Sequence, residues 1–210
     1  MNIAILLFEA VDLLDSGGPY EVFLTANRLH ERDGGKCLFN VSTVTIDDQP
    51  VTSYGGLGLI PSGTMSEAMH ADLLIVPGTI DTEPVTANKQ LIRHISEFHN
   101  NKDTERVVAS VCTGSFLLAK AGLLDNCKWT THWEDVDLLA EKLTTNQLPD
   151  NGATRNVRWV DSGSVVTGAA LSSGIAMALH LVNRFAGIEL AQRTANQIEY
   201  QWDSEGSNHA

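Results

Sequence analysis

The stretch Ala109-Ser-Val-Cys-Thr-Gly-Ser115 decides how this chain folds, because a strand-forming run stops there and a helical pattern begins. The preceding residues, 106–111, are rich in valine, which is typical of a strand covered on both faces. Gly114 would let the chain turn sharply into a helix that continues over residues 116–121. Cys112 is therefore predicted to stand at a tight strand-to-helix turn, at the carboxyl edge of a sheet.

Outside this stretch the chain alternates between predicted strands and helices. Residues 2–8 form a continuous apolar run, as expected of a buried strand, and a glycine-containing loop, 15–19, leads into a helix from about Gly18. Further signals predict strands at 39–46, 72–76 and 129–131, hairpins at 51–60 and 159–167, and helices at 91–98, 134–143, 173–185 and 188–202. This alternation predicts an α/β fold of three layers, in which a mostly parallel central sheet has helices on both faces.

The composition is that of an acidic globular domain. Of 210 residues, 43% are hydrophobic, and we expect one domain over residues 1–203 with a disordered tail over 204–210. A formal net charge of −12 argues against direct nucleic-acid binding. The apolar runs are too short to span a membrane, so we expect no membrane association.

The three cysteines, Cys37, Cys112 and Cys127, form neither a CxxC pair nor a cysteine-histidine ligand pattern. An odd set of this kind disfavours a disulfide framework and a zinc site, and it fits a reducing cytoplasm. The histidines likewise lack the spacing of metal ligands. We therefore expect a cytoplasmic protein with no metal and no cofactor.

Cys112 is the candidate nucleophile. A helix that begins just after it would point backbone N–H groups and the positive end of its dipole at the sulfur, which predicts a lowered thiol pKa. Asp15, after the first strand, can lie at the same sheet edge and exchange a proton with the thiol. Two alternatives stay open: Cys112 can be a structural core residue, and Asp15 can simply cap a helix.

The neighbours of these two residues suggest how a substrate could be held. The backbone N–H groups of Thr113 and of Gly78, which ends another strand, are candidates for an oxyanion hole. His132 is the histidine best placed to pair with Cys112, although a structural role is the more frequent one for such a histidine. The candidate site therefore comprises Cys112, Asp15 and Thr113 as catalytic residues, with ligand contacts from Gly78, Thr79, Gly114 and His132.

Six ordered motifs are spread over most of the chain. They are Leu-Asp-Ser-Gly-Gly-Pro-Tyr-Glu-Val-Phe (14–23), Val-Pro-Gly (76–78), Ser-Val-Cys-Thr-Gly-Ser (110–115), Ala-Gly-Leu-Leu-Asp (121–125), Thr-Thr-His-Trp (130–133) and Ser-Gly-Ile-Ala-Met-Ala-Leu (173–179). Together they resemble the ThiJ/PfpI superfamily. The resemblance implies a flavodoxin-like fold of the class I glutamine amidotransferase type, and a homodimer.

Two branches of that superfamily resemble this chain: isocyanide hydratases and the amino-terminal domains of GlxA-type regulators of the AraC class. The hydratase branch implies that Cys112 attacks the substrate carbon to form a thioimidate while Asp15 handles protons. Cys112-Thr113 replaces the Cys-His pair of PfpI-type proteases, which disfavours a peptidase. Two departures weaken the hydratase assignment: Thr79 stands where many relatives have glycine, and Ala176 where an aspartate is common.

These observations leave three hypotheses. The leading one is a small-molecule-sensing domain of a GlxA-like regulator, in which DNA would be contacted only by a separate helix-turn-helix region absent from this chain. The rival is a cysteine-dependent hydratase acting on isocyanides. A third is a redox sensor, which would follow from an ionised thiol at Cys112.

Overall fold

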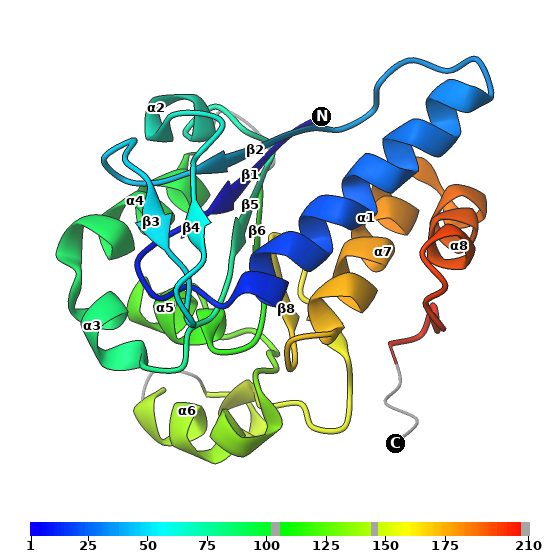
Figure 1. Cartoon of the computed structure of the whole chain (residues 1–210). Helices are drawn as coiled ribbons and strands as arrows, with labels where there is room; N and C mark the ends of the chain where they lie inside the picture. Colours follow the sequence, from blue (N-terminus) through cyan, green and yellow to red (C-terminus); the bar gives the residue numbers. More distant parts are fainter. Residues whose placement is uncertain (102–105, 144–146, 207–210) are drawn as a thin grey trace.

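The computed structural model describes residues 1–101, 106–143 and 147–206 and contains a six-stranded central sheet. The strand order is β2-β1-β5-β6-β8-β7, and every neighbouring pair is parallel except β7 and β8 (Figure 1). The strands are β1 (Asn2–Leu6), β2 (Asn40–Val44), β5 (Leu73–Val76), β6 (Val107–Ser110), β7 (Trp159–Asp161) and β8 (Val165–Gly168). The predicted mostly parallel sheet is confirmed.

Helices cover both faces of this sheet (Figure 1). One layer consists of α1 (Leu13–Arg32), α7 (Ser173–Ala186) and α8 (Ile188–Gln197). The opposite layer contains α2 (Met65–Ala68), α3 (Thr82–Ala87), α4 (Lys89–Asn100) and α5 (Gly114–Lys120), and α6 (Val136–Lys142) lies beyond the carboxyl ends of the strands. The three-layer architecture is therefore as predicted.

Alternate residues of the central strands supply the two cores. In β1, Ala4 and Leu6 pack with the α4 and α5 side, whereas Ile3 and Ile5 pack with α1 and α7. This division follows from the period-two geometry of a strand, whose successive side chains point to opposite faces. Because both faces are covered, the strand reads as a continuous apolar run without alternation.

The first helix begins earlier than expected. Residues 15–19 were predicted to form a loop, but α1 starts at Leu13 and contains Gly18 and Pro19. Gly18 lies against α7, where an added Cβ would be 3.0 Å from Ile175 Cγ1. The glycine therefore serves close helix packing rather than a turn, and the loop prediction was wrong for that reason.

Four other segments test the predictions. The hairpin at 51–60 is confirmed by antiparallel β3 (Val51–Thr52) and β4 (Gly58–Leu59), and the hairpin at 159–167 by β7 and β8. The strand expected at 129–131 is only an isolated bridge between Trp129 and Ala153. The last helix, α8, stops at Gln197 instead of continuing to 202.

The segment after α8 folds back on the domain. Trp202 is buried and its indole N–H donates to the Ala176 carbonyl, while the Gly206 carbonyl accepts from the Arg158 N–H. Of the tail predicted over 204–210, residues 207–210 lie outside the described part. Of the remainder, Ser204 and Glu205 are exposed, and Gly206 is buried against Trp159 of β7.

All three cysteines are free thiols: Cys37 is exposed, Cys112 buried and Cys127 half-buried. In the described residues, the helices are too short or too polar to serve as membrane spans. Because no thiol is tied up in a disulfide, the reactivity of each cysteine depends on its surroundings.

Two tryptophans four positions apart provide a test of the core. Trp129 is fully buried and its indole N–H donates to the Asn151 carbonyl, whereas Trp133 is 72% exposed. We expect Trp129→Ala to lower the free energy of unfolding by about 3–5 kcal/mol through cavity formation. Trp133→Ala should change it by less than about 0.5 kcal/mol. Denaturant titration measures both values, and similar losses in the two variants would contradict this packing.

Candidate active site

Cys112 occupies a strained turn at the end of β6. Its φ angle is +54°, in the left-handed region that non-glycine residues rarely adopt. The Cys112 N–H donates to the carbonyls of Gly168 (3.2 Å) and Ala169 (2.7 Å), at the end of the neighbouring strand β8. The strand-to-helix turn predicted from the sequence is thus present, and the adjacent strand holds it.

Two hydroxyl groups brace the same turn from the other side. Thr131 Oγ1 donates to the Cys112 carbonyl at 2.9 Å and accepts from Ser115 Oγ at 2.7 Å, and Ser115 Oγ also lies 3.2 Å from that carbonyl. All of these groups are buried. Such a network offsets the strain of the positive φ angle, because each polar group in it has a partner.

Asp15 is a buried carboxyl group in the first turn of α1. It is fully excluded from solvent, its Oδ2 accepts from the Gly78 N–H at 2.9 Å, and its Oδ1 has no hydrogen-bond partner among the described residues. Burial raises the pKa of Asp15 to about 7, the Gly78 bond opposes this rise, and the nearby Asp12 charge adds to it. Asp15 can therefore both donate and accept a proton near neutral pH. The N-cap of α1 is Asp12, so helix capping does not explain Asp15.

Gly78 brings these groups together because it has no side chain. A Cβ there would lie 2.6 Å from Thr113 Oγ1 and 2.8 Å from Asp15 Oδ2, distances that side chains do not adopt. Its N–H is occupied by Asp15, and its carbonyl accepts from the Asp12 N–H at 2.9 Å. Gly78 therefore positions Asp15 rather than presenting a free donor, which corrects the oxyanion hole expected from the sequence.

Thr113 and Thr79 lock the loops after β6 and β5 to each other. The Thr113 hydroxyl donates to the Thr79 carbonyl (2.6 Å) and accepts from the Thr79 N–H (2.9 Å). The Thr79 hydroxyl donates to the Ala10 carbonyl (2.8 Å). The Thr79 hydroxyl, which a glycine would lack, is therefore satisfied by the Ala10 carbonyl.

The thiol of Cys112 is neutral, not ionised. Burial raises the pKa of Cys112 to about 12, and the negative charges of Asp15, Asp12 and Asp135 contribute, against a hydrogen bond from the Thr113 N–H that lowers it. The prediction of a lowered pKa was wrong because desolvation and the charges of three carboxyl groups outweigh the hydrogen bond from the Thr113 N–H. A preformed thiolate is thus absent near neutral pH.

Two acidic residues that the sequence did not single out shape this electrostatic environment. Burial raises the pKa of Asp12, and the nearby His132 partly opposes this rise. Asp135, at the start of α6, raises the pKa of the Cys112 thiol through its negative charge. His132 lies near both carboxyl groups, with Nδ1 3.7 Å from Asp135 Oδ2. No local motif marks Asp12 or Asp135, because their relevance depends on how separate segments meet. His132 caps a 3₁₀ turn, Trp133–Asp135, as the Glu134 N–H donates to its Nδ1.

Two small residues have packing roles near the site. A Cβ on Gly114 would be 2.2 Å from the Val76 carbonyl, so glycine lets α5 approach the end of β5. This geometry gives Gly114 a role in the turn, and its contact with a ligand stays a prediction. Ala176 is fully buried in the core beneath α1, and an aspartate there would add a charge to that core.

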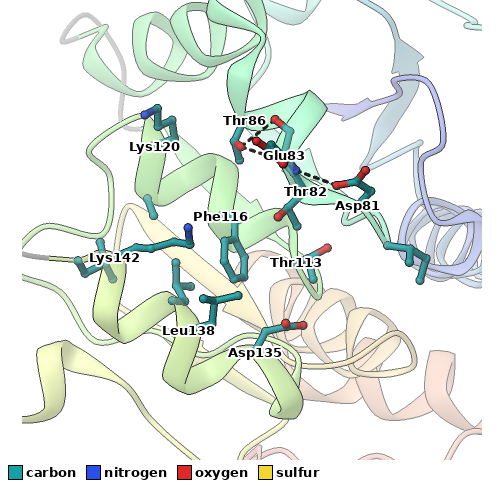
Figure 2. A pocket seen from close by; sticks show the side chains of 14 residues that line it. Asp81, Thr82, Glu83, Thr86, Thr113, Phe116, Lys120, Asp135, Leu138 and Lys142 are labelled. Atoms are coloured by element: carbon teal, nitrogen blue, oxygen red, sulfur yellow. Dashed lines mark hydrogen bonds between the residues drawn. The ribbon is translucent and has the colours of Figure 1, made fainter.

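A pocket of about 760 Å³ lies beside the turn, between α3, α5 and α6 (Figure 2). Thr113 and Asp135 belong to both the pocket wall and the surroundings of Cys112. The other walls are apolar and charged side chains, namely Ile80, Asp81, Thr82, Glu83, Thr86, Phe116, Ala119, Lys120, Leu138, Leu139, Lys142 and Leu143. A small molecule in this pocket would contact Thr113, the residue that follows Cys112.

Comparison with known proteins gives consistent matches. The model of the DJ-1/PfpI family matches residues 1–184. Isonitrile hydratase of Pseudomonas putida is 34% identical over 95% of this chain and 78% of its own length. The HTH-type transcriptional regulator GbdR of Pseudomonas aeruginosa is 26% identical over 95% of this chain, which spans about half of that regulator. A ThiJ/PfpI family protein from Pseudomonas syringae superposes with a TM-score of 0.77 at 26% identity, over 96% of this chain and 76% of that one.

Asp15 gives the stability of the fold a pH dependence of defined sign. Its pKa is about 7 when folded and near 3.8 when unfolded, so the folded state binds the proton more tightly and stability falls as pH rises from about 4 to about 7. Relative to Asp15→Asn, wild type should lose roughly 4 kcal/mol over this interval. Denaturant titrations across pH measure the difference, with Glu31→Gln on the same helix as control. Parallel curves for wild type and Asp15→Asn would contradict the buried carboxyl group.

Proposed function

Because the chain belongs to the DJ-1/PfpI family and pairs a buried thiol with a buried carboxyl group, we propose that it hydrates isocyanides to N-substituted formamides. The observation that carries this proposal is the state of Asp15: its pKa is about 7 and its Oδ1 has no partner among the described residues. That oxygen is available to move a proton between the Cys112 thiol and a substrate. General acid-base catalysis works best with a pKa near the working pH.

The first proposed step joins the sulfur to the substrate. The terminal isocyanide carbon bonds to Cys112 Sγ, the thiol proton passes to the Asp15 carboxylate, and Asp15 delivers it to the same carbon. The product is a thioimidate, S–CH=N–R, with the carboxylate regenerated. A neutral thiol that loses its proton only during attack needs an adjacent base, and Asp15 supplies it.

The second step releases the product. Water adds to the thioimidate carbon while Asp15 takes one of its protons and passes it to the nitrogen. The C–S bond then breaks, the remaining hydroxyl proton returns to the sulfur, and the N-substituted formamide leaves. One water is consumed, and both protein groups end in their starting states.

The similarity to isonitrile hydratase supports this assignment. That enzyme is 34% identical and aligned over 95% of this chain, whereas the regulators GbdR and CdhR of Pseudomonas aeruginosa are 26% and 27% identical. The two departures noted in the sequence do not touch the reacting groups. Thr79 keeps its backbone bonded to Thr113, and Ala176 lies in the core.

A second candidate function is a ligand-sensing domain of a transcriptional regulator, with DNA contacted through a separate region. The observation that favours it is the placement of Cys112: the residue is 4% exposed, and the neighbouring pocket is lined by Thr113 but not by Cys112. A ligand could fill that pocket without reacting. Oxidation sensing is opposed by the raised pKa of the Cys112 thiol, because the thiolate is the form that oxidants attack.

We also propose that the chain forms a homodimer in the cytoplasm. Leu13 and Leu14 at the start of α1 are each more than 40% exposed, and the free thiols suit a reducing compartment. A dimer would cover apolar surface of this kind.

Substitution of the reacting groups tests the enzymatic proposal. With an aliphatic isocyanide, we expect Cys112→Ala to abolish formamide production and Asp15→Asn to lower kcat by at least about 100-fold. Cys127→Ala, at a thiol outside the site, should retain activity. Chromatography of the formamide measures turnover, and circular dichroism checks folding. Absence of turnover by the wild-type protein would refute the hydratase and favour the sensing domain.

The pH dependence of turnover tests the role of Asp15 separately. Asp15 must be ionised to accept the thiol proton, so kcat/KM should fall as pH decreases below about 7, with an apparent pKa near that value. His132→Gln should keep this acidic limb, whereas Asp15→Asn should lose it. If His132→Gln removes the limb and Asp15→Asn keeps it, the titrating group is not Asp15.

A further inference from the structure

The pocket beside Cys112 has charges of opposite sign at its two ends. Asp81 and Asp135 lie on the sides nearer Thr113, Glu83 lies beside Thr86, and Lys120 and Lys142 lie at the far side, at the ends of α5 and α6 (Figure 2). Such an arrangement orients a polar ligand, because each end favours a different charge.

Lys142 is directed at the interior of this pocket. Its side chain extends from the last turn of α6 towards Phe116, whereas Lys120 points away from the centre (Figure 2). Within the parts of the chain that the structure describes, neither lysine side chain makes an ion pair or hydrogen bond, whereas Arg155 pairs with both Asp137 and Asp150. A basic residue in the last turn commonly interacts with helix carbonyls, but Lys142 is directed into the pocket, where its ammonium group has no partner among the described residues (Figure 2).

Apolar side chains separate the two ends. Phe116, Leu139 and Leu143 are buried core residues whose outer atoms line the pocket, and Leu138 is nearly half-exposed there. An aliphatic or aromatic ligand body would bury its surface against these groups, at about 25 cal/mol per Å² of apolar area.

The end of the pocket at Thr113 and Asp135 disfavours anions. Asp15, Asp12 and Asp135 all act electrostatically on Cys112, and each would repel a negative group that approached the thiol. A ligand with one neutral and one anionic end would therefore place the neutral end at Thr113 and Asp135 and the anionic end at Lys142. Only that orientation satisfies both sets of charges.

We propose that the pocket selects small molecules with an apolar body and a terminal carboxylate bound by Lys142, and that Lys142 determines this specificity. Resting on the proposed hydratase function, the substrate class is an isocyanide whose other end carries a carboxylate. The isocyanide group is uncharged overall and can approach the acidic surroundings of the thiol. The carboxylate forms a charge-assisted hydrogen bond with the ammonium group, which is stronger than a neutral one.

Kinetics with a matched pair of substrates tests the proposal. A straight-chain ω-isocyanoalkanoate and its methyl ester differ only in charge at the far end, and wild type should show a lower KM for the acid. Lys142→Met should raise the KM of the acid about 10-fold with little change in kcat, and should leave the ester unaffected. Lys36→Met, at an exposed lysine outside the pocket, is the control and should change either KM less than about 2-fold. Equal KM values for acid and ester in the wild type, or equal effects of the two lysine variants, would overturn the assignment to Lys142.

Binding to Cys112→Ala separates failure of this inference from failure of the hydratase. Calorimetry of that variant with the same two compounds measures affinity without turnover. If Cys112→Ala binds the acid more tightly than the ester, and adding Lys142→Met to that variant removes the difference, the carboxylate site is supported. This holds even if the wild-type protein produces no formamide. Turnover of both compounds with no preference in binding would keep the hydratase and refute the carboxylate site. No binding and no turnover would refute both.

Discussion

The hydrogen bond between the Gly78 N–H and Asp15 Oδ2 is the contact on which the site depends. It holds a fully buried carboxyl group beside the thiol, and it forms only because residue 78 has no side chain to displace Asp15 or Thr113. The early start of α1 serves the same contact, since Asp15 must lie in its first turn to reach the end of β5. The carboxyl ends of β5 and β6 then bring the two loops together, where parallel α/β sheets usually bind ligands.

Burial explains why the thiol and the carboxyl group behave as a pair. Desolvation raises the pKa of both groups, and the charge of Asp15 further disfavours ionisation of Cys112. The fold accepts a loss of stability to keep this arrangement: a strained φ angle at Cys112 and, within the described residues, an unpartnered oxygen on Asp15. Destabilising features of this kind concentrate at functional sites, because selection for function retains them there and not elsewhere.

The sequence predicted the sheet and the turn because those depend on local patterns. The valine-rich run before Cys112 and the apolar run at 2–8 form buried strands as expected, and the turn residues mark the hairpins. It failed where tertiary packing overrides local preference: Gly18 allows α1 to contact α7 instead of breaking the helix. It failed also on the thiol pKa, since burial and the convergence of Asp12 and Asp135 are properties of the assembled fold. Their positions could not be read from spacing along the chain.

A neutral thiol narrows the chemistry that this site can support. An ionised cysteine would react with many electrophiles and oxidants, whereas a protonated one reacts only where a base removes its proton during attack. An isocyanide carbon needs a nucleophile and a proton at the same atom, and a thiol with an adjacent carboxylate can deliver both. The raised pKa of Cys112 is therefore not an obstacle to the proposed reaction. It is the property that would reserve the sulfur for a substrate positioned between Cys112 and Asp15.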